Sequence, residues 1–282
     1  MHAAALSTAL PDASADPLDF SLADRLPARA AGRGRLLIGA SPRGGRPGLL
    51  FVPGAYHGAW CYAHYLAYFA AAGLACAALD VRGHGALPQD AAFPSVTIAD
   101  LGQDVADALD ALEGPTVVIG HSMGALPALL AARRRPVAGV VLLAPSPPGD
   151  LPGALALPPV PGTEPRKAPD ASEIRARFLA TAPARDVGEV SRRLCAESPQ
   201  VLNDRYLLRV AIGAAPFGAP GLCLEAGLDT HDRHPPGQDR AIARRYGFSH
   251  AVLARQPHCM MYADNWQASA GAILEWHRAQ FG

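Results

Sequence analysis

A short segment near the middle of the chain constrains the fold more than any other. Residues 117–119 are Val, Val and Ile, and they run into Gly-His-Ser-Met-Gly at 120–124, followed by an Ala- and Leu-rich stretch. β-Branched residues favour strands, whereas Ala and Leu favour helices. The segment therefore predicts a strand, a sharp turn and a helix. Such a turn needs small residues on both sides of Ser122, which Gly120 and Gly124 supply, and it would raise the serine hydroxyl above the backbone.

The composition limits the classes of protein to which the chain can belong. Its 282 residues suffice for one large α/β domain or two small ones, and half of them are hydrophobic. Basic and acidic residues number 25 each. This balance argues against a nucleic-acid partner or an anionic membrane surface. Since no apolar run approaches the roughly 18 residues that cross a bilayer, we expect no membrane partner either.

The cysteines and the first residues bear on the cellular compartment. Five cysteines are widely spaced and form no Cys-x-x-Cys motif: Cys61, Cys76, Cys195, Cys223 and Cys259. This pattern argues against a disulfide framework or a zinc site and favours a reducing compartment. The first six residues lack a basic region, and Pro11 interrupts the segment early. We therefore expect no signal peptide and a cytoplasmic protein.

The remaining chain alternates between strand and helix patterns. Strands are predicted at 35–39, 48–52, 74–79, 137–143, 221–226 and 250–253, and helices at 60–72, 97–112, 240–246 and 268–277. Thr97 and Asp100 resemble a capping box at the start of one helix. The alternation predicts an α/β fold with a mostly parallel sheet covered by helices on both faces.

Two segments interrupt this alternation. Residues 1–33 mix Ala, Pro, Asp and Ser without periodicity and are expected to form a partly ordered arm. Nine prolines fall between Pro145 and Pro169, and three helix-like stretches follow at 172–181, 187–197 and 200–212. We interpret 146–216 as a helical cap inserted into a core formed by 34–145 and 217–282. From this proline-rich, helical segment we expect a small to medium, fairly apolar substrate.

Five motifs in a fixed order carry a resemblance to a known family. They are FVPGAYHGAW at 51–60, DVRGHG at 80–85, GHSMG at 120–124, GLD at 227–229 and PHCMM at 257–261. Together they resemble the α/β-hydrolase family, in particular its small capped esterases, lactonases, plant methylesterases and hydroxynitrile lyases. The resemblance covers about 48–145 and 218–280. It implies the α/β-hydrolase fold with an inserted cap, and chemistry that needs no cofactor.

The family's catalytic residues follow the order serine, acid, histidine, and Ser122, Asp229 and His258 obey it. A serine hydroxyl is a weak nucleophile that needs a base, and a carboxylate fixes the tautomer of that base. Asp232 is a second candidate for the acid. The family often has a proline a few residues after its acid, and Pro235 and Pro236 follow Asp232 at that spacing. We favour Asp229, which is closer to the end of the predicted strand.

The resemblance also implies which residues surround the serine. The backbone amides of Ala55 and Met123 would form the oxyanion hole. Tyr56, His57 and Trp60 would line the substrate pocket, although packing of the first helix explains Trp60 equally well. His121 lies within the turn and is expected to shape the cleft. His231 and His234 have a spacing that could suggest a metal, but without a second ligand cluster we expect no metal site.

Three functional hypotheses follow from these residues. The leading one is a cofactor-independent serine hydrolase that cleaves a carboxylic ester, lactone or thioester of a small molecule through an acyl-enzyme. The second keeps the same triad but uses it for a lyase, carbon–carbon hydrolase, cyclase or dehydratase step, because fold does not settle the reaction. The third is a non-catalytic ligand-binding homologue, which the complete triad disfavours. The oligomeric state stays open, with a homodimer as one expectation.

Overall fold

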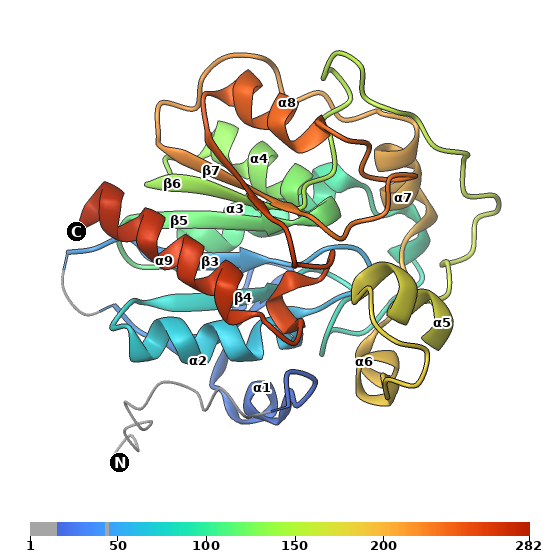
Figure 1. Cartoon of the computed structure of the whole chain (residues 1–282), viewed down its shortest axis with the longest axis horizontal. Coiled ribbons are helices and arrows are strands. Elements are labelled where there is room, and N and C mark those ends of the chain that lie inside the picture. The colour runs from blue at the N-terminus through green and yellow to red at the C-terminus, as the bar shows by residue number, and fades with distance from the viewer. Residues whose placement is uncertain (1–15, 43–44) are drawn as a thin grey trace.

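The computed structural model describes residues 16–42 and 45–282. Within them, eight strands form one sheet in the order β1-β2-β4-β3-β5-β6-β7-β8 (Figure 1). From β4 to β8 all neighbouring strands are parallel, while β2 pairs antiparallel with both β1 and β4. The strands are β1 (Ala28–Ala31), β2 (Gly34–Ala40), β3 (Gly48–Val52), β4 (Cys76–Asp80), β5 (Thr116–His121), β6 (Gly139–Leu143), β7 (Gly221–Ala226) and β8 (Ser249–Leu253). The predicted, mostly parallel sheet is confirmed.

Helices alternate with these strands along the chain. They are α1 (Ser21–Arg25), α2 (Ala63–Ala71), α3 (Ile98–Ala111), α4 (Ala125–Arg134), α5 (Ala171–Glu173), α6 (Gly188–Arg193), α7 (Pro199–Tyr206), α8 (Gln238–Tyr246) and α9 (Gln267–Phe281). Single 3₁₀ turns occupy Ala59–Tyr62, Phe93–Ser95, Ser122–Gly124 and Met260–Tyr262, and Ile174–Phe178 form a π-helical turn. The capping box before α3 is present: the Asp100 N–H donates to Thr97 Oγ1 and the Thr97 N–H donates to the Asp100 carboxylate.

The sheet separates two hydrophobic cores. Successive side chains of a strand point to opposite faces, so the fully apolar strands supply both cores at once. In β3, Leu49 and Phe51 pack with α1, α2 and α9, whereas Leu50 and Val52 pack with α3, α4 and α8. The two groups of helices accordingly lie on opposite faces of the sheet (Figure 1). The α/β-hydrolase fold class inferred from the motifs is confirmed.

The N-terminal region contains more structure than the sequence predicted. Its described part includes α1 and β1, and β1 pairs antiparallel with β2 at the edge of the sheet. The sequence of β1, Ala-Arg-Ala-Ala, has little strand propensity, so the pairing with β2 determines its conformation. Phe20, just before α1, is fully buried, and its ring centroid lies 4.7 Å from that of Trp60. The first 15 residues of the predicted arm lie outside the described residues.

A long insertion, residues 144–220, joins β6 to β7. It contains α5, α6 and α7, one within or overlapping each of the three predicted helix-like stretches, although each helix is shorter than its pattern. All three lie beyond one end of the sheet (Figure 1). The cap boundaries at 146 and 216 stay a prediction, and this segment is called the insertion below.

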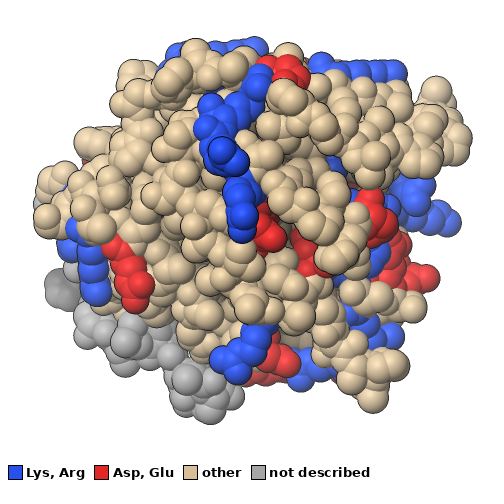
Figure 2. All heavy atoms as spheres, turned by 45° about the horizontal axis from the view of Figure 1, so that its top comes forward, with Lys and Arg blue, Asp and Glu red and all other residues tan. Residues whose placement is uncertain are grey.

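The distribution of charged side chains on the surface agrees with the equal numbers of acidic and basic residues in the sequence. On the face that Figure 2 shows, most Lys and Arg side chains lie beside Asp or Glu side chains. Across residues 16–42 and 45–282, no helix combines the length and apolar character that crossing a bilayer requires.

Candidate active site

The turn after β5 holds Ser122 in a strained conformation. Its φ of 52° lies in the left-handed region, which few non-glycine residues adopt. Close packing explains the glycines on both sides. A Cβ atom on Gly124 would overlap the carbonyl of Pro53, and one on Gly120 would lie 2.7 Å from the Cα of Ala125. The turn therefore forms only with small residues at these positions, as the sequence pattern predicted.

The loop after β8 brings His258 to Ser122. The Nε2 atom of His258 lies 2.9 Å from Ser122 Oγ, and its Nδ1 atom lies 2.6 Å from Asp229 Oδ2. A carboxylate only accepts hydrogen bonds, so Nδ1 carries a proton and donates a hydrogen bond to Asp229. In the neutral imidazole, Nε2 then has a free lone pair facing the serine hydroxyl. This is the arrangement that a general base requires.

The structure brings Asp229, and not Asp232, to His258. Burial raises the pKa of Asp229, but the charge and hydrogen bond of His258 outweigh it and lower the pKa to about 2. The Thr230 N–H also donates to Asp229 Oδ1 at 2.8 Å. The carboxylate is therefore ionised at neutral pH. Asp232 is exposed, and the hydrogen bond that lowers its pKa comes from Thr230.

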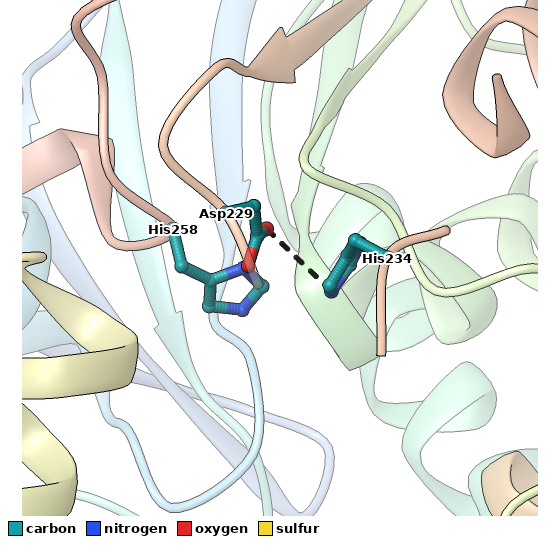
Figure 3. Close-up of side chains that lie close together, drawn as sticks. All are labelled: Asp229, His234 and His258. Carbon is teal, nitrogen blue, oxygen red and sulfur yellow. Dashed lines mark hydrogen bonds and ion pairs between the residues drawn. The ribbon is translucent and has the colours of Figure 1, made fainter. Parts of the chain in front are cut away.

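A second histidine lies against the same carboxylate (Figure 3). His234 Nε2 is 3.7 Å from Asp229 Oδ2, and the His234 and His258 ring centroids are 4.8 Å apart. Burial, reinforced by the charge of His258, lowers the pKa of His234 to about 3, so this ring is neutral. Sequence reasoning did not find this contact; its one signal there was the spacing of His231 and His234.

These three side chains also have the spacing of a metal site. Asp229, His234 and His258 each offer one ligand atom, and these atoms lie within 4.8 Å of one another. A metal ion there would compete with His258 for Asp229 Oδ2, which already accepts the 2.6 Å hydrogen bond. The absence of a metal stays a prediction from the sequence.

The loop after β3 presents Ala55 to the same cavity as Ser122 and Met123. His57 Nδ1 donates to the Ala55 carbonyl at 2.7 Å, and the next N–H, that of Tyr56, donates to Glu197 Oε2 at 3.1 Å. Tyr56 itself has a φ of 68°. The peptide between Ala55 and Tyr56 is thus held on both sides, which fixes the loop beside the serine. Because His57 Nδ1 donates, Nε2 accepts the 2.8 Å hydrogen bond from the Tyr262 hydroxyl.

Glu197 also forms a buried ion pair that the sequence did not reveal. It precedes α7 in the insertion, whereas its partner His84 follows β4 in the core, and both side chains are at most 1% exposed. His84 Nε2 lies 3.0 Å from Glu197 Oε2, and Nδ1 lies 3.0 Å from the Arg82 carbonyl. Both partners only accept, so both ring nitrogens are protonated. Burial opposes this charge, but the Glu197 carboxylate outweighs it and raises the pKa of His84.

Three of the four predicted pocket residues reach the cavity, whose volume is about 450 Å³. Tyr56, His57 and His121 line it, and His121 Nε2 donates to the His258 carbonyl at 2.9 Å. The contact of Trp60 with the substrate stays a prediction. Trp60 is buried against Phe20 and does not line this cavity, an arrangement that favours the packing alternative.

Comparison with known proteins places the chain in a family. Residues 49–272 match the family model described as the alpha/beta hydrolase family. The chain belongs to this family. This α/β-hydrolase is 38% identical over 101 residues to Esterase PIR7B of Oryza sativa subsp. japonica. It is 37% identical over 99 residues to Probable esterase PIR7A of Oryza sativa subsp. indica. Each match covers 34% of this chain and 37% of the relative, little more than a third of the relative's length.

Solved structures resemble this α/β-hydrolase over most of their length. A methylesterase from Arabidopsis has a TM-score of 0.63 at 18% identity, covering 81% of this chain and 98% of its own. A pyrethroid hydrolase from Sphingobium faniae JZ-2 has a TM-score of 0.64 at 21% identity, covering 83% and 98%. Tomato methylketone synthase I, complexed with 2-tridecanone, has a TM-score of 0.65 at 15% identity, covering 83% and 99%. At these identities the likeness shows the fold alone.

Proposed function

We propose that this α/β-hydrolase is a serine hydrolase that cleaves a carboxylic ester, lactone or thioester through an acyl-enzyme, without a cofactor. One observation carries the proposal: His258 bridges Ser122 Oγ and Asp229 Oδ2 at 2.9 Å and 2.6 Å. Esterases among the sequence relatives support the same reaction class.

The arrangement accounts for each step of such a reaction. Ser122 Oγ attacks the carbonyl carbon while His258 Nε2 accepts the hydroxyl proton, and the carbonyl electrons move onto oxygen. The amides of Ala55 and Met123 stabilise this oxyanion, and loss of one such donor costs about 3 kcal/mol. The intermediate then expels the alcohol or thiol, which takes the proton from His258. Water, deprotonated by the same nitrogen, releases the acid and restores Ser122.

Covalent labelling tests the proposal directly. A fluorophosphonate should form one adduct, located on Ser122 by peptide mass spectrometry, and the enzyme should turn over members of a panel of esters, lactones and thioesters. The adduct should persist in Ser146→Ala, because that hydroxyl lines the same cavity without bonding to His258. An adduct on Ser122 without turnover of any panel member would contradict hydrolysis and favour a lyase or cyclase step by the same triad.

The choice of acid has its own test. Asp229→Asn should lower kcat by about 10,000-fold, because an amide holds His258 in the wrong tautomer without removing its packing. Asp232→Asn is the matched control and should keep kcat within about two-fold of wild type, since surface changes away from the site have small effects. Both are measured on one ester that wild type hydrolyses. A loss in Asp232→Asn equal to that in Asp229→Asn would overturn the assignment.

A further inference from the structure

Basic side chains outnumber free acidic ones in the cavity that holds Ser122. Five line it: Arg166, Lys167, Arg177, Arg205 and Arg233. Three acidic side chains also line it. Asp229 is committed to His258, Glu173 forms an ion pair with Arg177 at 2.8 Å, and Asp170 Oδ1 accepts a hydrogen bond from the Glu173 N–H at 2.9 Å. This lining differs from the fairly apolar pocket that the sequence predicted, because six charged side chains of the insertion line the cavity.

Arg205, on α7, is the most unusual of these cations. It is only 5% exposed, and its Nη1 atom has no hydrogen-bond partner among the residues that the structure describes. Nη2 donates to the main-chain carbonyl of Arg233 at 3.3 Å, a neutral acceptor. Burial lowers the pKa of Arg205 to about 10, which still leaves it charged at neutral pH. Burying a charge without a counter-charge is costly. An anionic group bound beside this guanidinium would offset that cost.

Arg233 connects this cation to the catalytic residues. Its guanidinium donates to the Tyr206 hydroxyl and lies 5.2 Å from the centre of the Tyr206 ring, next to Arg205 on α7. Its neighbour in the chain, His234, packs against His258 with ring centroids 4.8 Å apart. Arg205 and Arg233 therefore line the same cavity of about 450 Å³ as His258 and Ser122.

We propose that the substrate carries, besides its scissile carbonyl, an anionic group that binds Arg205 and Arg233. The planar, multiply donating guanidinium matches a carboxylate or a phosphate, and the unpartnered Nη1 supplies a donor for either. The substrate class is then an ester, lactone or thioester that bears a carboxylate or phosphate in its acyl or leaving part. This inference rests on the proposed hydrolase function and narrows it.

Two esters that differ only in one terminal group test the preference. 4-Nitrophenyl valerate and the mono-4-nitrophenyl ester of glutaric acid have equal chains ending in methyl or carboxylate, and succinate and adipate analogues extend the series. Wild type should prefer the carboxylate ester of the fitting length. Arg205→Met and Arg233→Met should each lower kcat/KM for that ester by roughly 10- to 100-fold while sparing the neutral ester, since they remove a charge-assisted hydrogen bond. Arg209→Met is the matched control, because Arg209 is exposed nearby and does not line the cavity.

A binding measurement separates this proposal from the hydrolase proposal. Glutarate, or glycerol phosphate as the phosphate arm, should bind Ser122→Ala in calorimetry and lose that binding when Arg205→Met is added. Binding of this kind without turnover of any ester would support the anion site and contradict hydrolysis. Hydrolysis of neutral esters with no anionic preference in the series, or with a preference unchanged in Arg205→Met, would overturn the anion site and leave hydrolysis standing.

The thermal midpoint distinguishes ligand binding from a structural role. Replacing a buried unpaired charge by an apolar side chain of similar length should leave Tm unchanged or raise it. A marked fall in Tm for Arg205→Met, with both esters affected equally, would show that Arg205 holds the fold and would overturn the proposal.

Discussion

Ser122→Ala should lower kcat for ester hydrolysis by about a million-fold, leaving only the rate that the oxyanion hole and binding provide. The reason is that His258 Nε2 lies 2.9 Å from the hydroxyl oxygen of Ser122, the group that it would deprotonate. Without that oxygen the base has no nucleophile to activate. His258→Ala should cost nearly as much, and the double variant hardly more, because residues that act as one unit show non-additive effects.

Single-turnover and steady-state assays on one activated ester measure these losses. His231→Ala is the matched control: His231 is exposed on the loop after β7, outside the cavity, so kcat should stay near the wild-type value. Circular dichroism shows whether each variant folds. Folded Ser122→Ala that retains more than about a hundredth of wild-type kcat would contradict the role assigned to this serine.

Glu197→Gln should lower the free energy of unfolding by about 3–5 kcal/mol, the usual cost of removing one member of a buried ion pair. Glu197 Oε1 accepts from the Ser198 N–H, and Oε2 accepts from the Tyr56 N–H and from His84. In the variant, one of the two carboxylate oxygens is replaced by an NH₂ group, which cannot accept a hydrogen bond. In either orientation of the amide, at least one of these N–H donors therefore loses its acceptor. Because the Tyr56 amide is one of them, the Ala55 loop loses a support and kcat should also fall.

The loss of stability in Glu197→Gln should depend on pH in a defined direction. The pKa of His84 is raised in the folded state above its unfolded value of about 6.5. The contribution of the pair is therefore fully present below about pH 6.5 and is lost as pH rises through the raised pKa. The difference in Tm between wild type and Glu197→Gln should be largest near pH 6 and should narrow at alkaline pH.

Denaturant unfolding and thermal scans at several pH values check both statements. Asp110→Asn is the control, because it breaks the exposed Asp110–Arg135 pair and should leave Tm almost unchanged at every pH. A Glu197→Gln protein as stable as wild type at pH 6, or a Tm difference that widens toward alkaline pH, would disprove the structural role of the pair.

The sequence predicted the fold well where local patterns coincide with burial. The apolar run before Ser122, the glycines around it and the capping box at Thr97 and Asp100 are short-range signals, and each appears where expected. The strand β1 escaped prediction because its four residues acquire their conformation from β2. The helices of the insertion were located but overestimated in length, since their patterns continue into loops.

The site could be predicted as far as its motifs extend. Ser122 and His258 each lie in a recognisable motif, but the choice between Asp229 and Asp232 needed the position of the imidazole in space. The pairing of His84 with Glu197 joins residues 113 positions apart, which no local pattern encodes. The charges along the cavity were likewise hidden, because composition counts Arg205 and Arg233 without saying which way they point.

The hydrogen bond from the Tyr56 N–H to Glu197 limits how the substrate specificity of such a protein can change in evolution. The insertion contributes a carboxylate that completes a loop of the core, while the core contributes the cation that the carboxylate needs. The two parts are therefore not interchangeable modules. A transplanted insertion without an acid at this point would leave a histidine and two amides unsatisfied, and would disturb the loop that faces the reacting carbonyl. New specificities in this lineage are accordingly expected to arise by single replacements in the cavity wall, such as at Arg205, and not by exchange of whole insertions.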